Sequence, residues 1–349
     1  MPCAPAAGFA CGLSAIGARL ASMTLDEIRF TDASADRDSL PACLEAILRA
    51  AGSQVDYRSI HAALGLSFWI AAPRRKRCLG CWMSEGHDAL LVDACRLFGV
   101  RLRELHPPEA AIGLEDSPEF RQHFEASYRP LMEIALGHRQ PSLVRRGWPD
   151  PCGNLWGIVT QRREDGLGFA GVSPGGGDAP APLTLPAVQV YVVEEIRPRA
   201  VAPREILRHV AQTARRVQTN QLDPRLGLLT GSAAYDAWLE QLKHDSVCPS
   251  CAQVGGACHE RMADHVARNR ETARELLAEL KKLLPESRGM IEARESGCHG
   301  VIEALRRARA RGTSPENIDS PSARAEWEAD IRAARTHDER TAEACQAFE

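Results

Sequence analysis

The residues around Cys43 combine a potential nucleophile with the signals of a helix start. Asp38 or Ser39 can cap a helix, Pro41 suits its first turn, and Gly52 suits its end. We therefore expect Cys43 in the first turn of a helix, where unpaired backbone amides and the helix dipole favour thiolate over thiol. Such a thiolate is a candidate nucleophile. The alternatives are a small buried residue where the helix packs on a sheet, and a metal-binding or regulatory thiol.

A second group of residues has the spacing of metal ligands. Cys248 and Cys251 form a Cys-x-x-Cys motif, and Cys258 and His259 follow seven and eight positions after it. The motif places two sulfurs on one side of a loop, and two more ligands would complete a tetrahedral zinc site. Neighbouring helical residues point about 100° apart, so we expect only one of Cys258 and His259 to ligate. The alternatives are a reactive dithiol and unliganded cysteines in an interdomain loop.

Cys78, Cys81 and Trp82 superficially match the Cys-Gly-Ser-Cys-Trp signature of papain-type proteases. Arg75 stands where the signature requires glutamine, and no suitably spaced His and Asn follow. We therefore reject a papain-type site here and keep half of a metal site as the alternative. The basic run at 74–77 is most simply a solvated loop, although its charges could also hold an anionic or phosphopantetheine-like group.

The elements that would position Cys43 fall within the first 200 residues. Residues 1–30 lack strong periodicity, and we expect them to be poorly ordered. Expected helices cover 38–52, 88–98 and 119–136, and expected strands cover 100–105, 141–144, 155–160, 169–172 and 188–196. Helices followed by antiparallel strands predict an α+β domain over residues 31–200.

Beyond residue 200 the pattern becomes helical throughout. Expected helices cover 204–218, 232–243, 257–283, 289–312 and 321–346, which predicts an all-helical second domain over residues 201–349. The charged residues around Arg270 are expected to form a solvated face. Tyr235 and Trp238 are most simply core residues, but they would line a cleft facing Cys43 if the helical domain closes over the sheet.

Short motifs between residues 35 and 280 carry a family resemblance. They are Ser39-Leu40-Pro41-Ala42-Cys43 with Ala50-Ala51-Gly52, then Leu64-Gly65-Leu66-Ser67, Gln140-Pro141-Ser142-Leu143-Val144, Trp156-Gly157-Ile158-Val159-Thr160 and Gly231-Ser232-Ala233-Ala234-Tyr235-Asp236-Ala237-Trp238. The chain thereby resembles the butirosin-biosynthesis acyltransferase family and, more distantly, bacteriocin-processing cysteine peptidases. The resemblance implies a papain-like α+β fold followed by a helical C-terminal region.

The resemblance also implies thiol chemistry at Cys43. That chemistry is acyl transfer or amide hydrolysis through a thioester, on a small-molecule or carrier-bound acyl substrate at the interface of the two domains. Asn154 is the second catalytic candidate, and Trp156, Tyr235 and Trp238 are the substrate-binding candidates.

The chain departs from both families near the expected site. No histidine precedes Trp156, where Asn154 and its neighbours stand, and Ser173-Pro174 replaces the Asp-Pro of the peptidases. A thiolate without an imidazole lacks the general acid that a leaving amine needs, whereas a thiolate leaves without protonation. A typical protease is therefore not expected. The histidines that could substitute are His138, His209, His244 and His259.

Composition narrows the remaining functional classes. The chain has 349 residues, a formal net charge of −3 and no long apolar run, so neither nucleic acid nor a membrane is expected as a partner. The start of the chain lacks a secretory pattern, and we expect a cytoplasmic protein. Twelve cysteines in a reducing compartment are not expected to form a disulfide framework. The oligomeric state stays open, a homo-oligomer included.

Two functional hypotheses follow. The first is a cysteine-dependent acyltransferase or amidohydrolase. The alternative is a non-catalytic papain-like scaffold that binds a metal ion, with zinc as the candidate, or a thiophilic ligand through clustered cysteine and histidine residues. A structural or regulatory interaction protein is the residual class.

Overall fold

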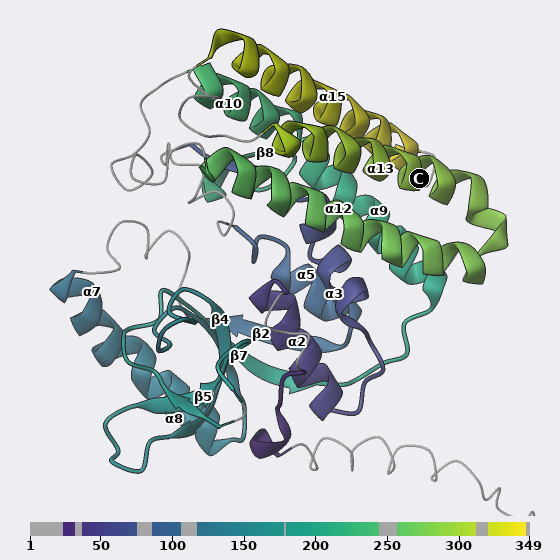
Figure 1. Cartoon of the computed structure of the whole chain (residues 1–349). Coiled ribbons are helices and arrows are strands. Elements are labelled where there is room, and N and C mark those ends of the chain that lie inside the picture. Colours follow the sequence, from purple (N-terminus) through teal and green to yellow (C-terminus); the bar gives the residue numbers. More distant parts are fainter. Residues whose placement is uncertain are drawn as a thin grey trace, which may run out of the picture. The chain divides into compact units, whose positions relative to one another are not determined.

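The computed structural model describes residues 24–31, 37–74, 86–105, 117–177, 179–243, 257–311 and 320–346, and its fold is α+β (Figure 1). The chain divides into two compact units. The first comprises Met1–Val55 and Cys95–Ala200, and the second comprises Asp56–Ala94 and Val201–Glu349. The α+β prediction is confirmed. Residues 56–94 precede the sheet in the sequence but belong to the helical unit, whereas the sequence places them with the N-terminal domain.

The first unit is built on an antiparallel six-stranded sheet in the order β2-β7-β3-β4-β5-β6. The central strands are buried because both neighbours satisfy their backbone and apolar side chains cover them. Their bounds are β2 (Val100–Glu104), β3 (Ser142–Arg145), β4 (Trp156–Arg162), β5 (Phe169–Val172), β6 (Ala181–Pro182) and β7 (Gln189–Ile196).

Helix α2 (Ser39–Ala50) packs against β4 through buried apolar residues that include Leu44 and Ile47. Gly52 follows its end with a φ of +83°, a conformation that glycine adopts without steric cost. The other helical segments of this unit are η1 (Leu25–Glu27), α7 (Pro118–His123), the π-turn η4 (Phe124–Tyr128) and α8 (Arg129–Gly137), while α5 (Leu91–Leu97) crosses the division between the units. The predicted helices at 38–52 and 119–136 are therefore present.

The second unit is helical apart from one strand pair. Its bounds are α3 (Tyr57–Ala63), η3 (Leu66–Phe68), β1 (Ala71–Pro73), α9 (Pro203–Gln218), η5 (Pro224–Leu226), β8 (Leu228–Thr230), α10 (Ser232–Lys243), α12 (Ala257–Leu283), η6 (Pro285–Ser287), α13 (Arg288–Ala310) and α15 (Pro321–Gln346). β1 pairs antiparallel with β8, so the expectation of no strand beyond residue 200 was wrong at 228–230. Three residues are too few for alternation to identify a strand.

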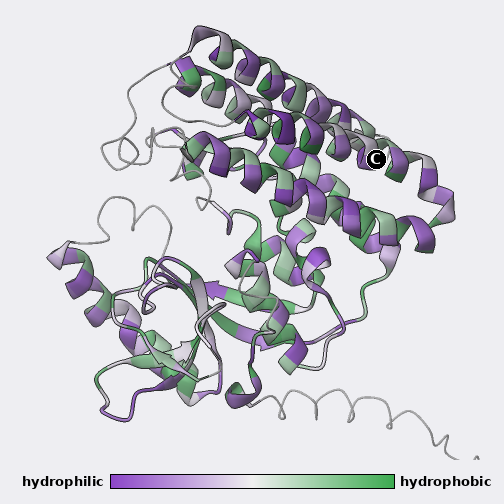
Figure 2. Ribbon diagram, in the orientation of Figure 1, coloured by the Kyte–Doolittle hydropathy of each residue, from purple (hydrophilic) through white to green (hydrophobic). Residues whose placement is uncertain are grey.

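The three long helices α12, α13 and α15 pack together, and polar and apolar residues alternate along them (Figure 2). Small residues bring α13 close to α15. A Cβ atom added at Gly297 would lie 2.0 Å from Thr341 Oγ1, and one added at Gly300 would lie 2.3 Å from His337 Nδ1. Among the helices of the described ranges, none is long and apolar enough to span a bilayer.

Gly297→Ala is therefore expected to lower the free energy of unfolding by about 1–3 kcal/mol, because α13 and α15 must separate to admit the methyl group. Urea denaturation followed by circular dichroism measures the change. Gly289→Ala on the same helix is the matched control, since an added Cβ there meets nothing within 4 Å. Equal effects of the two substitutions would contradict the close approach at Gly297.

Candidate functional site

Cys43 lies inside the first unit, one full turn beyond the start of α2. The helix begins at Ser39, and the Cys43 side chain is 0% exposed. Burial raises the pKa of the Cys43 thiol well above its usual value, because a thiolate would lose its hydration. Among the described residues, no hydrogen bond reaches its sulfur. The expected ionised nucleophile at the helix start was therefore wrong, and the structure matches the alternative of a small buried residue.

The side chain that meets the start of β4 is a hydroxyl and not the Cys43 thiol. The backbone N–H of Trp156 donates to Ser39 Oγ at 3.1 Å, which joins the first residue of α2 to the first residue of β4. Asn154 is exposed two residues before the strand. The helix start and the strand start do meet, but the residues that meet are Ser39 and Trp156, while Cys43 points into the core.

Trp156 is a core residue of the sheet. Its side chain is 3% exposed, and its ring centroid lies 6.0 Å from that of Tyr191 on β7, at an interplanar angle of 37°. A ring enclosed in this way has no surface to offer a substrate. The expectation that Trp156 binds substrate was therefore wrong, because packing within the sheet uses its aromatic faces.

Within the described residues, no histidine considered as a proton-transfer partner forms a hydrogen bond with Cys43. His138 is exposed at the end of α8. His209 belongs to the second unit, where its Nε2 lies 3.2 Å from the carbonyl oxygen of Ala63. Burial lowers the pKa of His209, while the hydrogen bond to Ala63 partly opposes the shift. His244 lies outside the described residues.

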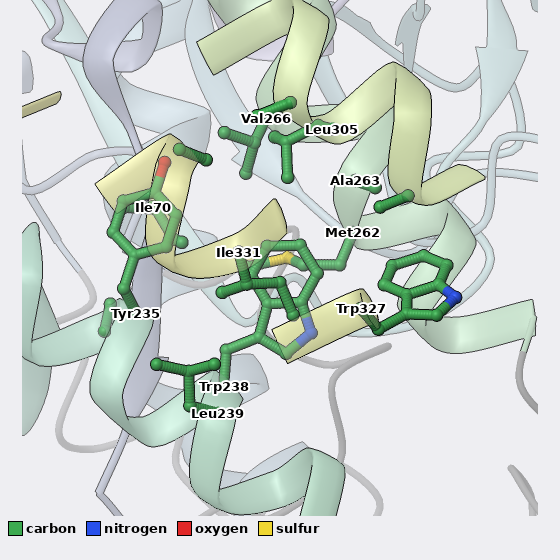
Figure 3. Close-up of a cluster of buried hydrophobic side chains, with 14 of the residues drawn as sticks. Ile70, Tyr235, Trp238, Leu239, Met262, Ala263, Val266, Leu305, Trp327 and Ile331 are labelled. Atoms are coloured by element: carbon green, nitrogen blue, oxygen red, sulfur yellow. The ribbon is translucent and has the colours of Figure 1, made fainter. Parts of the chain in front are cut away.

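Tyr235 and Trp238 lie in the core of the helical unit (Figure 3). Both are 0% exposed, and their rings stack with centroids 6.4 Å apart. The Tyr235 hydroxyl donates to Asp338 Oδ2 at 2.8 Å. Trp238 Nε1 donates to His259 Nδ1 at 3.0 Å. The predicted cleft-lining role of Tyr235 and Trp238 was therefore wrong, because their polar atoms satisfy buried partners rather than face an opening.

The same hydrogen bond occupies Nδ1 of His259. Indole N–H is only a donor, so Nδ1 of His259 presents a lone pair to Trp238 and the neutral ring carries its proton on Nε2. Metal-binding histidines have the opposite arrangement, in which the second nitrogen donates. Burial lowers the pKa of His259 to about 4, so the ring stays neutral. The structure therefore does not show His259 as a metal ligand, and its assignment to a metal site stays a prediction.

The cysteines of the expected metal site are only partly described. Cys258 is 4% exposed near the start of α12, whereas Cys248 and Cys251 lie outside the described residues. Among the described residues, no group of three or more His, Cys, Asp and Glu side chains could hold a metal ion. The metal site at Cys248, Cys251 and Cys258 therefore stays a prediction.

A buried polar network in the helical unit was missed from the sequence. Arg270 on α12 is 0% exposed, and its Nε donates to Asp338 Oδ1 on α15 at 2.9 Å. Its Nη1 donates to the carbonyl oxygen of Ser67 at 3.0 Å, and Ser67 Oγ lies 2.8 Å from His61 Nδ1. The expected solvated face was therefore wrong at Arg270. Long-range pairing with Asp338, 68 residues away, leaves no local signal in the sequence.

No protein-family model matches the chain, and none of the curated proteins matches it in sequence. The resemblance to butirosin-biosynthesis acyltransferases therefore rests on the short motifs alone. What the chain does must be argued from its own contacts.

Asp338→Asn is expected to destabilise the protein by about 3–5 kcal/mol, because it leaves the Arg270 guanidinium buried without its counter-charge. The free energy of urea unfolding measures the loss. Asp236→Asn is the matched control, since Asp236 pairs with Arg335 at the surface and exposed pairs contribute about 1 kcal/mol or less. A loss no larger than that of the control would show that the Arg270–Asp338 pair does not hold the unit together.

Proposed function

We propose that this chain is a non-catalytic binding protein, in which an acyltransferase-like α+β scaffold has no reactive thiol at Cys43 and clustered cysteines hold a soft ligand. The burial of Cys43 is the observation that carries the proposal. A cysteine nucleophile must be ionised and accessible. Cys43 is 0% exposed, and burial raises its pKa well above the usual value, so it meets neither requirement.

The surroundings of the α2 start support the same conclusion. Ser39 presents a hydroxyl, which requires an adjacent base before it attacks an acyl carbon. Asn154 stands where the resemblance implies histidine, and an amide neither takes up nor releases a proton at neutral pH. Among the described residues, no imidazole forms a hydrogen bond with Ser39.

The proposed ligand is a soft metal ion, with zinc as the first candidate. Cys258 lies in the first turn of α12, and Cys251 and Cys248 precede it by seven and ten positions. Thiolates bind zinc and other soft ions in preference to hard ones. Because His259 is engaged with Trp238, three sulfurs are the donors in this proposal, and a fourth position would take an external thiol or another thiophilic ligand.

Chain purified without a histidine tag is expected to contain about one zinc per molecule by elemental analysis. Cys258→Ser should lose most of the metal, because a three-sulfur site loses one of its donors. Cys43→Ala is the control and should retain the metal of the parent chain. A chain without bound metal, or equal metal in the Cys258→Ser variant, would refute the proposed ligand site.

Acyl transfer to or from a small-molecule or carrier-bound acyl group is the second candidate, and one contact favours it. Ser39 Oγ lies 3.1 Å from the Trp156 amide nitrogen at the junction of α2 and β4. The resemblance implies Cys43 as the nucleophile, but the side chain that stands at this junction is the Ser39 hydroxyl. In this version the acyl group would be carried by Ser39 rather than by Cys43.

Intact-mass measurement distinguishes the two candidates. Incubation of the native chain with an acetyl thioester should produce no acetylated species, and iodoacetamide should leave Cys43 unmodified up to about pH 9. The physical reason is that the raised pKa keeps the thiol protonated above the usual cysteine value of about 8.5. Denatured chain, in which Cys43 reacts normally, is the control. An acetyl adduct that forms on the parent chain but not on Ser39→Ala favours acyl transfer. Preferential labelling of Cys43 by iodoacetamide would overturn both candidate functions, because each assumes that Cys43 is unreactive.

A further inference from the structure

Arg294 on α13 is a buried cation without a protein partner in the part of the chain that the structure describes. Its side chain is 0% exposed, and Nε, Nη1 and Nη2 all lack a hydrogen-bond partner there. A guanidinium keeps its charge in a protein interior, since its pKa lies far above neutrality. A buried charge that is neither paired nor hydrogen-bonded is strongly unfavourable. Something outside the described residues must therefore satisfy these donors.

Arg270 shows how the same unit treats a buried guanidinium that has partners. Its Nε donates to Asp338 Oδ1 at 2.9 Å, and its Nη1 donates to the carbonyl oxygen of Ser67 at 3.0 Å. Asp338 also accepts hydrogen bonds from Tyr235 and Gln218. This carboxylate is thus committed to other donors.

Several charged side chains act on the Cys298 thiol. Cys298 lies one turn from Arg294 on α13, and burial raises its pKa to about 12. Arg270, Arg294 and the exposed Arg274 act on that thiol as positive charges, and Asp338 acts as a negative charge. Asp338 pairs with Arg270, and Arg294 has no hydrogen-bond partner within the described residues.

The neighbours of Arg294 one turn away on α13 are Ile291 and Cys298. Both lie on the same face of α13 as Arg294, and both belong to a buried cluster. The other members of that cluster include Leu207 and Val210 of α9 and Leu276, Leu277 and Leu280 of α12. A water molecule could accept hydrogen bonds here but would not neutralise the charge, whereas an anion does both.

We infer that Arg294 anchors a binding site for a small oxyanion, a carboxylate or a phosphate, within the helical unit. The planar fork of a guanidinium donates two parallel hydrogen bonds, and carboxylate and phosphate oxygens match that geometry. The site is independent of the cysteines proposed to bind a metal ion. Because Arg294 is fully buried, the anion enters when the helices open or as the chain folds.

The test is equilibrium urea unfolding, measured in both the unfolding and the refolding direction so that the anion can enter during folding. Sodium phosphate and sodium acetate are the probes, and sodium chloride at equal ionic strength corrects for screening. We expect each oxyanion that binds to raise the wild-type midpoint, by about 1 M urea at a hundred times its dissociation constant. The arm that gives the larger shift identifies phosphate or carboxylate as the preferred group.

Arg294→Met should abolish the response to both oxyanions, and in chloride alone it should be at least as stable as the parent chain. Arg294→Lys keeps the charge but loses the fork, and it should weaken oxyanion affinity about 30-fold or more. Arg306→Met on the same helix is the matched control, since Arg306 is exposed and pairs with Glu271 and Glu303. Its response should equal that of the parent chain.

Two results would overturn the inference. One is an equal midpoint in phosphate, acetate and chloride for the parent chain. The other is an oxyanion response that survives in Arg294→Met. The readout does not depend on bound metal, so loss of the proposed metal site leaves this test unchanged, and failure of this test leaves the metal analysis valid.

Discussion

The ion pair between Arg270 and Asp338 is the interaction on which the helical unit depends. It joins α12 to α15, and through Ser67, Tyr235 and Gln218 its hydrogen bonds also reach η3, α10 and α9. A charge pair in a dry interior gains stability only when its remaining donors and acceptors are also satisfied. Here the ion pair and its partners come from five separate elements, so correct placement of one carboxylate requires correct placement of them all.

The same cost of burying charge decides how the cysteines and histidines behave. Cys43 and Cys298 are fully buried, and the loss of hydration raises both pKa values, which makes these thiols inert packing residues. The pKa of His259 shifts in the opposite direction, since burial lowers the pKa of a base and keeps the imidazole ring neutral. Residue types that suggest chemistry in a sequence therefore act as uncharged core groups in this fold.

Local patterns in the sequence were enough to predict the helices and strands. They were not enough to predict the environment of each side chain. The helix that begins at Ser39, the strands that become β3, β4 and β7, and the long C-terminal helices all follow from periodicity, capping and turn residues. Cys43 lies one helical turn beyond the start of α2. That turn separates the accessible end of the helix from the buried core of the unit. Burial of Arg270 depended on a partner far along the chain, which no window of neighbouring residues contains.

The candidate site was less predictable than the helices and strands, because it depends on the environment of individual side chains. The sequence predicted that the helix at 38–52 would pack on an antiparallel sheet, and the structure shows in addition that Ser39 meets Trp156 at the start of β4. Which atom would stand at the junction could not be anticipated, because the first residue of a helix is poorly defined by sequence. The direction of the Trp238–His259 hydrogen bond likewise follows only from three-dimensional packing.

The two units of the chain are interleaved in the sequence. Residues 56–94 belong to the helical unit, and residues 95–200 return to the unit of the sheet. The backbone therefore passes from one unit to the other three times, and neither is a single uninterrupted stretch. A gene fragment that ended at residue 200 would separate Ser67 and Phe68 from the helices they pack on. Neither unit can therefore be expressed complete as one continuous fragment of the chain.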